Sequence, residues 1–281
     1  MYFGVNLMEI GMKIRVLGLS YWLVFLGLSV AGCELFEDDQ ADDGPVQVTG
    51  TWITVEGGRF EMGNSRLPAA DPVHEVEVPE FEMKRTEVTV SEYTECVNTG
   101  VCSPPDTTLG NCNWGLAGYE NHPVNCVVWQ QAWTYCNWLG ARLPSESEWE
   151  YAARSEGSPS EYPWGMDTPS CLYAIMTDDS GVEGCGTKRT WPVCSRPNGN
   201  TGQGLCDMGG NVVEWVQDHF HVDYNGRPPT DGSAWEDVGI AYRVLRGAAY
   251  NTFEDHYLNV ASRGNSAEST TQDNIGFRCA R

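Results

Sequence analysis

The stretch HPVNCVVWQQAWTYCNWLGARLPSESEWEYAAR, residues 122–154, has the clearest helical patterning in this 281-residue chain. Its first half, Val128 to Gly140, predicts a helix that ends at the glycine. The expected buried face of that helix carries Trp129, Trp133, Cys136 and Leu139.

The second half of the stretch predicts another helix from its own start signal. Ser145 is followed three residues later by Glu148, which is the pattern of a capping box. The expected buried stripe of this helix consists of Trp149, Ala152 and Ala153.

The segments before these two helices are shorter. GGRFEMGNS (57–65) predicts a strand entering a turn, and HEVEVPEFEM (74–83) predicts one strand. TVSEYTECVN (89–98) predicts a short helix capped by Thr89 or Ser91. Beyond Arg154 the chain is rich in turn residues, as in RPNGNTGQG (196–204). Together these patterns indicate an irregular, loop-rich α+β domain, in which ten of the eleven tryptophans are available to fill the core.

The N-terminus has the pattern of an export signal. Lys13 and Arg15 precede the uncharged run 16–32, which ends in VAGC at Cys33. The ending resembles the lipobox of bacterial lipoproteins, in which the cysteine is acylated. We therefore expect a signal peptide at 1–32, an acidic flexible tether at 33–49 and one domain at 50–281. The implied location is the bacterial cell envelope, with a lipid on Cys33 holding the protein to a membrane, the outer one favoured. A spanning anchor is the alternative, because 17 uncharged residues could just cross a bilayer.

Charge and cysteine content narrow the class of protein. The formal charge of −22 argues against nucleic acid as a partner, since phosphate binding needs a basic face. Ten cysteines follow Cys33, an even number that predicts up to five disulfides behind an export signal. No CxxC pair occurs, which disfavours a metal site, and spacing alone leaves the connectivity open.

Seven segments in order resemble the sulfatase-modifying-factor family, also called formylglycine-generating-enzyme-like domains. They are GGRFEMGNS, HEVEVPEFEMKRTEVTVSEYTECV, the opening stretch, YPWG, GLCDMGGNVVEWVQD, RVLRG and GFRCAR. The resemblance covers nearly everything from about residue 50 onward, and it implies a variant of the C-type-lectin fold. It also implies a disulfide between Cys136 and Cys279. Local pairs Cys171–Cys185 and Cys194–Cys206 are the next expectation.

The family's founding activity oxidises a substrate cysteine with molecular oxygen, using two cysteines that bind Cu(I). The matching segment here is RVLRGAAYNTFEDHY (243–257), where the thiols would fall near Thr252 and Tyr257. No cysteine occurs from residue 207 to 278, and oxygen ligands do not replace soft thiolates on Cu(I), so copper is not expected. His219, His221 and His256 are the candidates for a replacement site, although exposed loop histidines are the favoured interpretation.

The resemblance further implies a structural calcium site in DMGGNVVEW (207–215). The matching ligands are the side chains of Asp207 and Glu214 with backbone carbonyls of Gly210 and Val212, an oxygen set that suits Ca²⁺. The alternative is that both acids are ordinary capping or surface residues.

The family's cleft is expected to survive as a groove for a peptide, protein or glycan ligand. Its candidate residues are Tyr250, Thr252, Phe253, His256, Tyr257 and Arg263. Their aromatic rings could equally fill the space of a lost site. The resemblance assigns Arg263, Asn274, Phe277 and Arg278 to the surrounding framework. The favoured function is a non-catalytic, lipid-anchored binding or structural protein. The alternative is a sulfatase-modifying oxidoreductase with an altered site.

Overall fold

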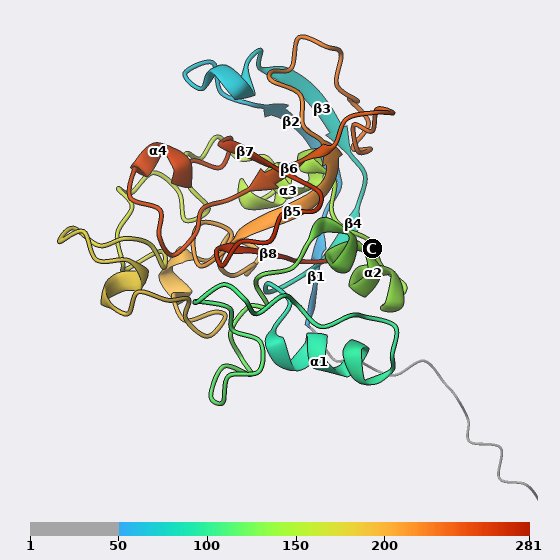
Figure 1. Ribbon diagram of the computed structural model, residues 1–281. Coiled ribbons are helices and arrows are strands. Elements are labelled where there is room, and N and C mark those ends of the chain that lie inside the picture. Colours follow the sequence, from blue (N-terminus) through green and yellow to red (C-terminus); the bar gives the residue numbers. More distant parts are fainter. Residues whose placement is uncertain (1–50) are drawn as a thin grey trace, which may run out of the picture. The chain divides into compact units, whose positions relative to one another are not determined.

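The computed structural model describes residues 51–281, so the predicted signal peptide, Cys33 and the whole tether lie outside the described residues. The described part is a mixed, loop-rich arrangement of short strands and helices (Figure 1). The strands are β1 (Trp52–Val55), β2 (Gly58–Met62), β3 (His74–Val78), β4 (Phe81–Lys84), β5 (Val213–His219), β6 (Tyr242–Arg246), β7 (Arg263–Ala267) and β8 (Ile275–Phe277). The helices are α1 (Val90–Asn98), α2 (Trp129–Trp138), α3 (Glu146–Ala153) and α4 (Asp255–Leu258). Three short 3-10 turns lie at Pro68–Ala70, Gly184–Gly186 and Pro197–Gly199.

The largest sheet has the strand order β7-β6-β5-β8. β6 pairs antiparallel with β5 and β7, and β8 pairs parallel with β5. Two antiparallel pairs, β1–β4 and β2–β3, complete the strands. The predicted strand 74–83 is therefore wrong as one element. It is divided at Pro79 into β3 and β4, because proline cannot donate to a strand ladder.

The four-stranded sheet separates two hydrophobic clusters. Val216 and Val244 belong to the cluster that contains Trp149 of α3. Their neighbours Trp215 and Leu245 belong to the cluster that contains residues of α1 and α2. Alternation along β5 and β6 thus buries both faces of the sheet, as expected when layers cover it on each side. In Figure 1 the β2–β3 pair lies above α3.

The capping signals are confirmed. Thr89 caps α1 and Ser145 caps α3, and in each the third helical residue returns a hydrogen bond to the cap, completing the box. The buried faces differ from the prediction. In α2, Trp133 is 39% exposed, and the buried residues are Trp129, Ala132, Tyr135 and Cys136.

Helix α3 is buried along its whole length, so the predicted three-residue stripe is too narrow. It packs against β2 and β3 on one side and β5 and β6 on the other. Its acids are buried because each meets an arginine, as the bonds from Arg263 to Glu146 and from Arg246 to Glu150 show. Because strands cover α3 on two sides, it has no solvent-exposed polar face of the kind found on a surface helix.

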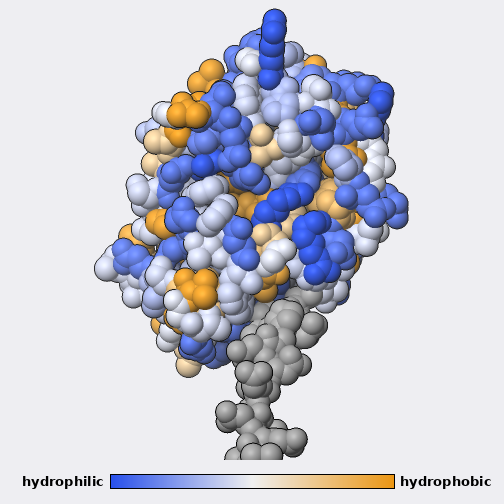
Figure 2. All heavy atoms as spheres, turned by 90° about the vertical axis from the view of Figure 1, so that its right-hand side faces the viewer, coloured by the Kyte–Doolittle hydropathy of each residue, from blue (hydrophilic) through white to orange (hydrophobic). Residues whose placement is uncertain are grey.

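All three predicted disulfides are present: Cys136–Cys279, Cys171–Cys185 and Cys194–Cys206. Cys96–Cys102 and Cys112–Cys126 complete a set of five. Every cysteine in the described range 51–281 is therefore paired. Within the same range no helix is both long and apolar enough to cross a bilayer. Figure 2 shows one face of the protein, on which apolar residues form small separate patches within a polar surface.

Candidate functional site

The segment that follows β6 is where the family's thiols were expected. It starts at Gly247, whose φ of 79° favours glycine. A side chain there would also lie 3.1 Å from the Trp149 ring, so the position is closed to larger residues. Ala248, Ala249 and Tyr250 then continue into the core, and the chain re-emerges at Asn251. Residues 251–257 form a surface ridge, which we call the ridge below.

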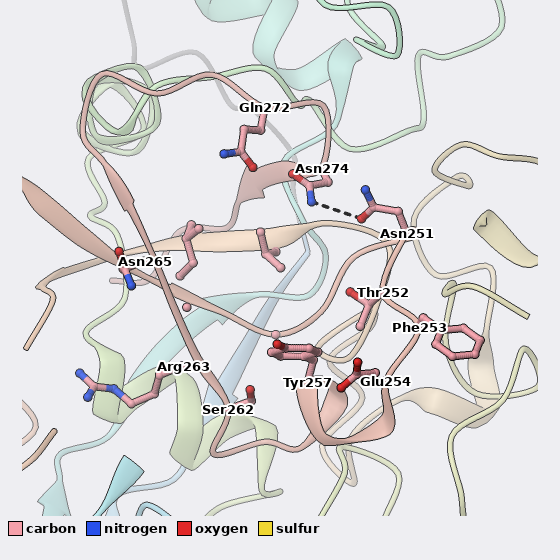
Figure 3. Close-up of a pocket in the computed structure, with 14 residues that line it drawn as sticks. Asn251, Thr252, Phe253, Glu254, Tyr257, Ser262, Arg263, Asn265, Gln272 and Asn274 are labelled. Carbon is pink, nitrogen blue, oxygen red and sulfur yellow. Dashed lines mark hydrogen bonds between the residues drawn. The ribbon is translucent and has the colours of Figure 1, made fainter. Parts of the chain in front are cut away.

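Beside this ridge lies a cleft of about 480 Å³ (Figure 3). Val213 of β5, Leu245 of β6 and Gly264 of β7 contribute to it, so it covers part of the face of the sheet. Polar side chains form much of the rest: Asn251, Thr252, Glu254, Ser262, Asn265, Gln272 and Asn274. This volume falls within the range of roughly 300–1,000 Å³ that is typical of small-molecule sites.

Of the six predicted cleft residues, Thr252, Phe253 and Tyr257 line the cleft with Arg263. Phe253 and Tyr257 are 63% and 52% exposed. The Thr252 hydroxyl accepts a hydrogen bond from the backbone N–H of Ala249 at 2.9 Å, which closes the turn before the ridge. The Arg263 side chain points away from the cleft in Figure 3 and bonds Glu146 at 2.6 Å, so its guanidinium does not face the cleft.

Two of the predicted cleft residues are elsewhere. Tyr250 is 1% exposed and lies beneath the surface, because Ala248 and Ala249 carry the chain inward. Burial raises the pKa of its phenol to about 12, and Asn111 Nδ2 donates to it at 3.4 Å. His256 belongs to the ridge but faces away from the cleft, next to Asp255, where its Nδ1 is 3.2 Å from Glu254.

The cleft offers no thiol. Thr252 and Tyr257 occupy the region where the family's thiols were expected, and the cysteines nearest in sequence, Cys206 and Cys279, are both in disulfides. Two thiolates are the ligands that suit Cu(I). The residues present therefore do not fit a copper centre of the family type.

The three candidate histidines do not converge. His219 Nδ1 accepts a hydrogen bond from the backbone N–H of Asp237, and His221 stacks on Trp235 with ring centroids 3.5 Å apart. His256 lies on the ridge with Glu254. Residues 51–281 hold no group of three or more histidine, cysteine or acidic side chains that could bind a metal ion. The replacement nitrogen site is thus without a supporting arrangement.

The predicted calcium ligands lie at the start of β5, and they differ in how far they are engaged. Glu214 accepts hydrogen bonds from Arg278 on both oxygens and from Trp149 Nε1 at 2.9 Å, so its lone pairs are occupied. Asp207 accepts from the backbone N–H of Cys194 at 2.6 Å, and burial raises its pKa to about 6. Glu214 would therefore have to leave Arg278 in order to bind a cation.

Glu87 belongs to this same buried group and was missed in the sequence. It accepts from Asn211 Nδ2 at 2.8 Å and from the backbone N–H of Val212 at 3.2 Å. Burial, with the charges of Asp207 and Glu214, raises its pKa well above the usual range. The only signal in the sequence was an acid flanked by the β-branched residues Thr86 and Val88.

Two of the residues that the resemblance assigned to the framework are fully buried. Arg278 is fully buried against Glu214, and Phe277 packs in the cluster with α1 and α2. Asn274, expected only as framework, also lines the cleft. Asn251, Ser262, Asn265 and Gln272 were not identified from the sequence, because each lies in a polar loop or on an edge strand that looks ordinary by itself.

Comparisons with known proteins bear on this site. The domain described as "Sulfatase-modifying factor enzyme 1-like domain" matches residues 38–281. A formylglycine-generating enzyme from Streptomyces coelicolor is 32% identical over 281 aligned residues, covering 81% of this chain and 88% of the enzyme.

Two further matches differ in coverage. The mouse protein "Inactive C-alpha-formylglycine-generating enzyme 2" is 34% identical over 165 residues. That match covers 56% of this chain and 48% of the mouse protein, about half of it. The solved structure of PvdO from Pseudomonas aeruginosa superposes with a TM-score of 0.71 at 30% identity, covering 84% of this chain and 95% of PvdO.

Proposed function

Because the chain belongs to the sulfatase-modifying factor enzyme 1-like family and yet has no cysteine from residue 207 to 278, we propose that it is a non-catalytic binding protein. In this proposal the family's scaffold holds a ligand in the cleft beside α4 and carries out no oxidation. The ligand is a peptide, a protein or a glycan. The protein is anchored to the bacterial cell envelope by a lipid on Cys33.

The observation that carries the proposal is the state of the cysteines. Family chemistry needs two thiolates for Cu(I), and all ten cysteines of residues 51–281 are committed to disulfides. Thr252 uses its hydroxyl to close a turn, and Tyr257 offers a phenol. A relative whose name describes it as inactive supports the idea that this scaffold can exist without the activity.

The binding part of the proposal is supported by the cleft. It is open to solvent, two of its aromatic rings are more than half exposed, and several of its amides face it (Figure 3). Exposed aromatic rings beside polar groups are typical of ligand sites, because the rings gain from burial only when a ligand covers them.

Calcium is part of the proposal as a structural ion. Asp207 would supply a carboxylate, and the carbonyls of Gly210 and Val212 would supply further oxygens. Glu214 would join only by releasing Arg278. Bound calcium would neutralise negative charge in a buried region where Glu87, Asp207 and Glu214 lie near Arg278.

The test of function is an activity assay with a reference. The full chain is incubated with Cu(I), oxygen, a thiol as electron donor and a cysteine-containing peptide, beside the Streptomyces enzyme under the same conditions. We expect oxygen uptake and aldehyde formation at the level of the blank. Turnover that depends on this protein would establish the oxidoreductase alternative instead.

Anchoring is tested separately by metabolic labelling of the expressed chain with an alkyne fatty acid. The label should be attached to the parent protein and be lost in Cys33→Ser. Equal labelling of the two proteins would exclude Cys33 as the modified residue.

A further inference from the structure

The cleft is close to electrically neutral in a strongly acidic protein. The chain carries a formal charge of −22, yet the acids and bases among the cleft residues are only Glu254 and Arg263. The Arg263 side chain is fully buried and bonds both oxygens of Glu146, at 2.6 and 2.9 Å. Glu254 lies at the rim with its carboxylate 3.2 Å from His256. Glu254 is therefore the exposed charge at the cleft, since Arg263 is paired with Glu146.

Amide groups take the place of charges. Asn251, Asn265, Gln272 and Asn274 all line the cleft, and an amide both donates and accepts hydrogen bonds. Asn274 Nδ2 donates to Asn251 Oδ1 at 3.2 Å, the bond drawn in Figure 3. Asn274 Oδ1 has no hydrogen-bond partner within the described chain. Asn274 Oδ1 is itself buried, so the amides that a ligand can reach are those of the exposed Asn265 and Gln272.

Apolar surface complements the amides. Val213 and Leu245 lie at the base of the cleft, and the ring of Tyr257 stands opposite Gln272 and Asn274 in Figure 3. The Phe253 ring points away from the cleft in Figure 3, so Tyr257 is the ring that faces it. A ligand that suits these walls has hydroxyl groups on its edge and an apolar face that can cover an aromatic ring.

We propose that the ligand of this cleft is an uncharged glycan, an inference that rests on the binding function proposed above. Hydroxyl groups donate and accept, as the amides do, and the C–H face of a sugar ring covers Tyr257. A peptide is the less suitable ligand. The cleft lies over the face formed by β5, β6 and β7, whereas strand addition by a peptide would use the outer edge of β7.

The experiment uses the full chain in detergent with two panels of probes: neutral oligosaccharides of hexoses and N-acetylhexosamines, and net-neutral peptides of similar size. Binding is detected by saturation-transfer NMR and quantified by calorimetry. Tyr257→Ala and Gln272→Ala should each weaken oligosaccharide binding at least about tenfold, equivalent to ~1.4 kcal/mol. Trp133→Ala is the matched control, since that ring is 39% exposed but lies on α2, away from the cleft. It should leave binding unchanged.

Salt gives an independent readout. Binding of an uncharged glycan should change less than about twofold between low salt and roughly 0.5 M NaCl, whereas a charged ligand would weaken because its attraction is screened.

Peptide binding that Tyr257→Ala abolishes, with no oligosaccharide bound, would overturn the glycan and keep the binding function. Oligosaccharide binding that survives both cleft variants would place the site elsewhere and overturn the inference. Cysteine oxidation by the protein would overturn the proposed function itself.

Discussion

Two neighbouring regions differ in how far their side chains are buried. In the first region, the acids of α3 pair with arginines of the sheet. These residues, Glu146, Glu150, Arg246 and Arg263, are fully or almost fully buried. Across the sheet, the ridge 251–257 leaves Phe253 and Tyr257 more than half exposed. The ridge is held by main-chain bonds, such as that from Thr177 N–H to the Thr252 carbonyl at 2.9 Å.

This difference in burial indicates which positions the fold constrains and which can accept other side chains. A buried charge that loses its partner is costly, so each position under α3 constrains the others. Exposed side chains on the ridge do not need a buried partner. They can therefore be replaced by other residues while the backbone of the ridge keeps its position. A family scaffold can therefore persist while its thiols are absent.

Removing the disulfide Cys136–Cys279 should give the largest effect on the framework. The bond joins buried residues of α2 and the chain end across 143 positions, whereas Cys171–Cys185 spans 14. From loop entropy, alanine pairs should lower the free energy of unfolding by roughly 5 kcal/mol for the first and about 3 kcal/mol for the second. Urea denaturation measures both. A larger loss for Cys171→Ala/Cys185→Ala would reverse the expected order.

Arg246→Ala should follow, with a loss of about 3–5 kcal/mol, because it leaves the buried carboxylate of Glu150 short of a partner at 2.6 Å. The carbonyls of Val260 and Ser262 lose a donor as well. Arg59→Ala is the control: its partners Glu75 and Glu77 are exposed, so it should stay within about 1 kcal/mol of the parent. An equal effect of the two variants in urea denaturation would contradict a role for buried pairing.

Calcium should stabilise the parent protein after treatment with EDTA. At a concentration about 100 times the dissociation constant, the gain is roughly 2.7 kcal/mol and is visible as a rise in melting temperature. Asp207→Ala should lose most of that gain, whereas Asp237→Ala, at an exposed acid paired with His221, should keep it. A parent that shows no shift with calcium would remove the ion from the proposal.

The pH dependence of stability should change in Asp207→Asn. Burial raises the folded pKa of Asp207 from 3.8 to about 6, so the folded state holds this proton more tightly than the unfolded state. Its contribution is fully present below pH 3.8 and is lost as the pH rises to about 6. Without calcium, the free energy of unfolding of the variant relative to the parent should rise across that window, in total by about 3 kcal/mol, because only the parent loses a proton at this position. Urea denaturation at several pH values measures the difference. If the free energies of unfolding of parent and variant changed in parallel with pH, the raised pKa of Asp207 would be contradicted.

Tyr257→Ala should have the smallest effect on the free energy of unfolding, within about 0.5 kcal/mol, because its side chain is 52% exposed. The same substitution should impair ligand binding, so stability and binding separate on the ridge. A loss of several kcal/mol in urea would show that the ring belongs to the framework.

Local chemistry made part of this fold predictable. Each capping box needs two residues three positions apart, and both Thr89 and Ser145 are caps in the structure. The disulfide Cys136–Cys279 came from the family resemblance rather than from spacing, which leaves pairings open.

Features set by distant contacts were harder to predict. The complete burial of α3 depends on β2 and β3 covering one side of it, and the exposure of Trp133 depends on which side of α2 meets the sheet. The cleft combines Asn251 with Asn265 and Gln272 only through the pairing of β6 with β7 and the return of the chain to β8. No local pattern in the sequence predicts that these residues lie in one cleft.

The most direct test of the central claim is a count of free thiols. The chain carrying Cys33→Ser is purified under oxidising conditions, denatured without reductant, alkylated and weighed as an intact protein. The account predicts that no alkyl group is added, since the ten remaining cysteines form five disulfides. A reproducible pair of alkylated cysteines would contradict it and restore a possible thiolate site for copper.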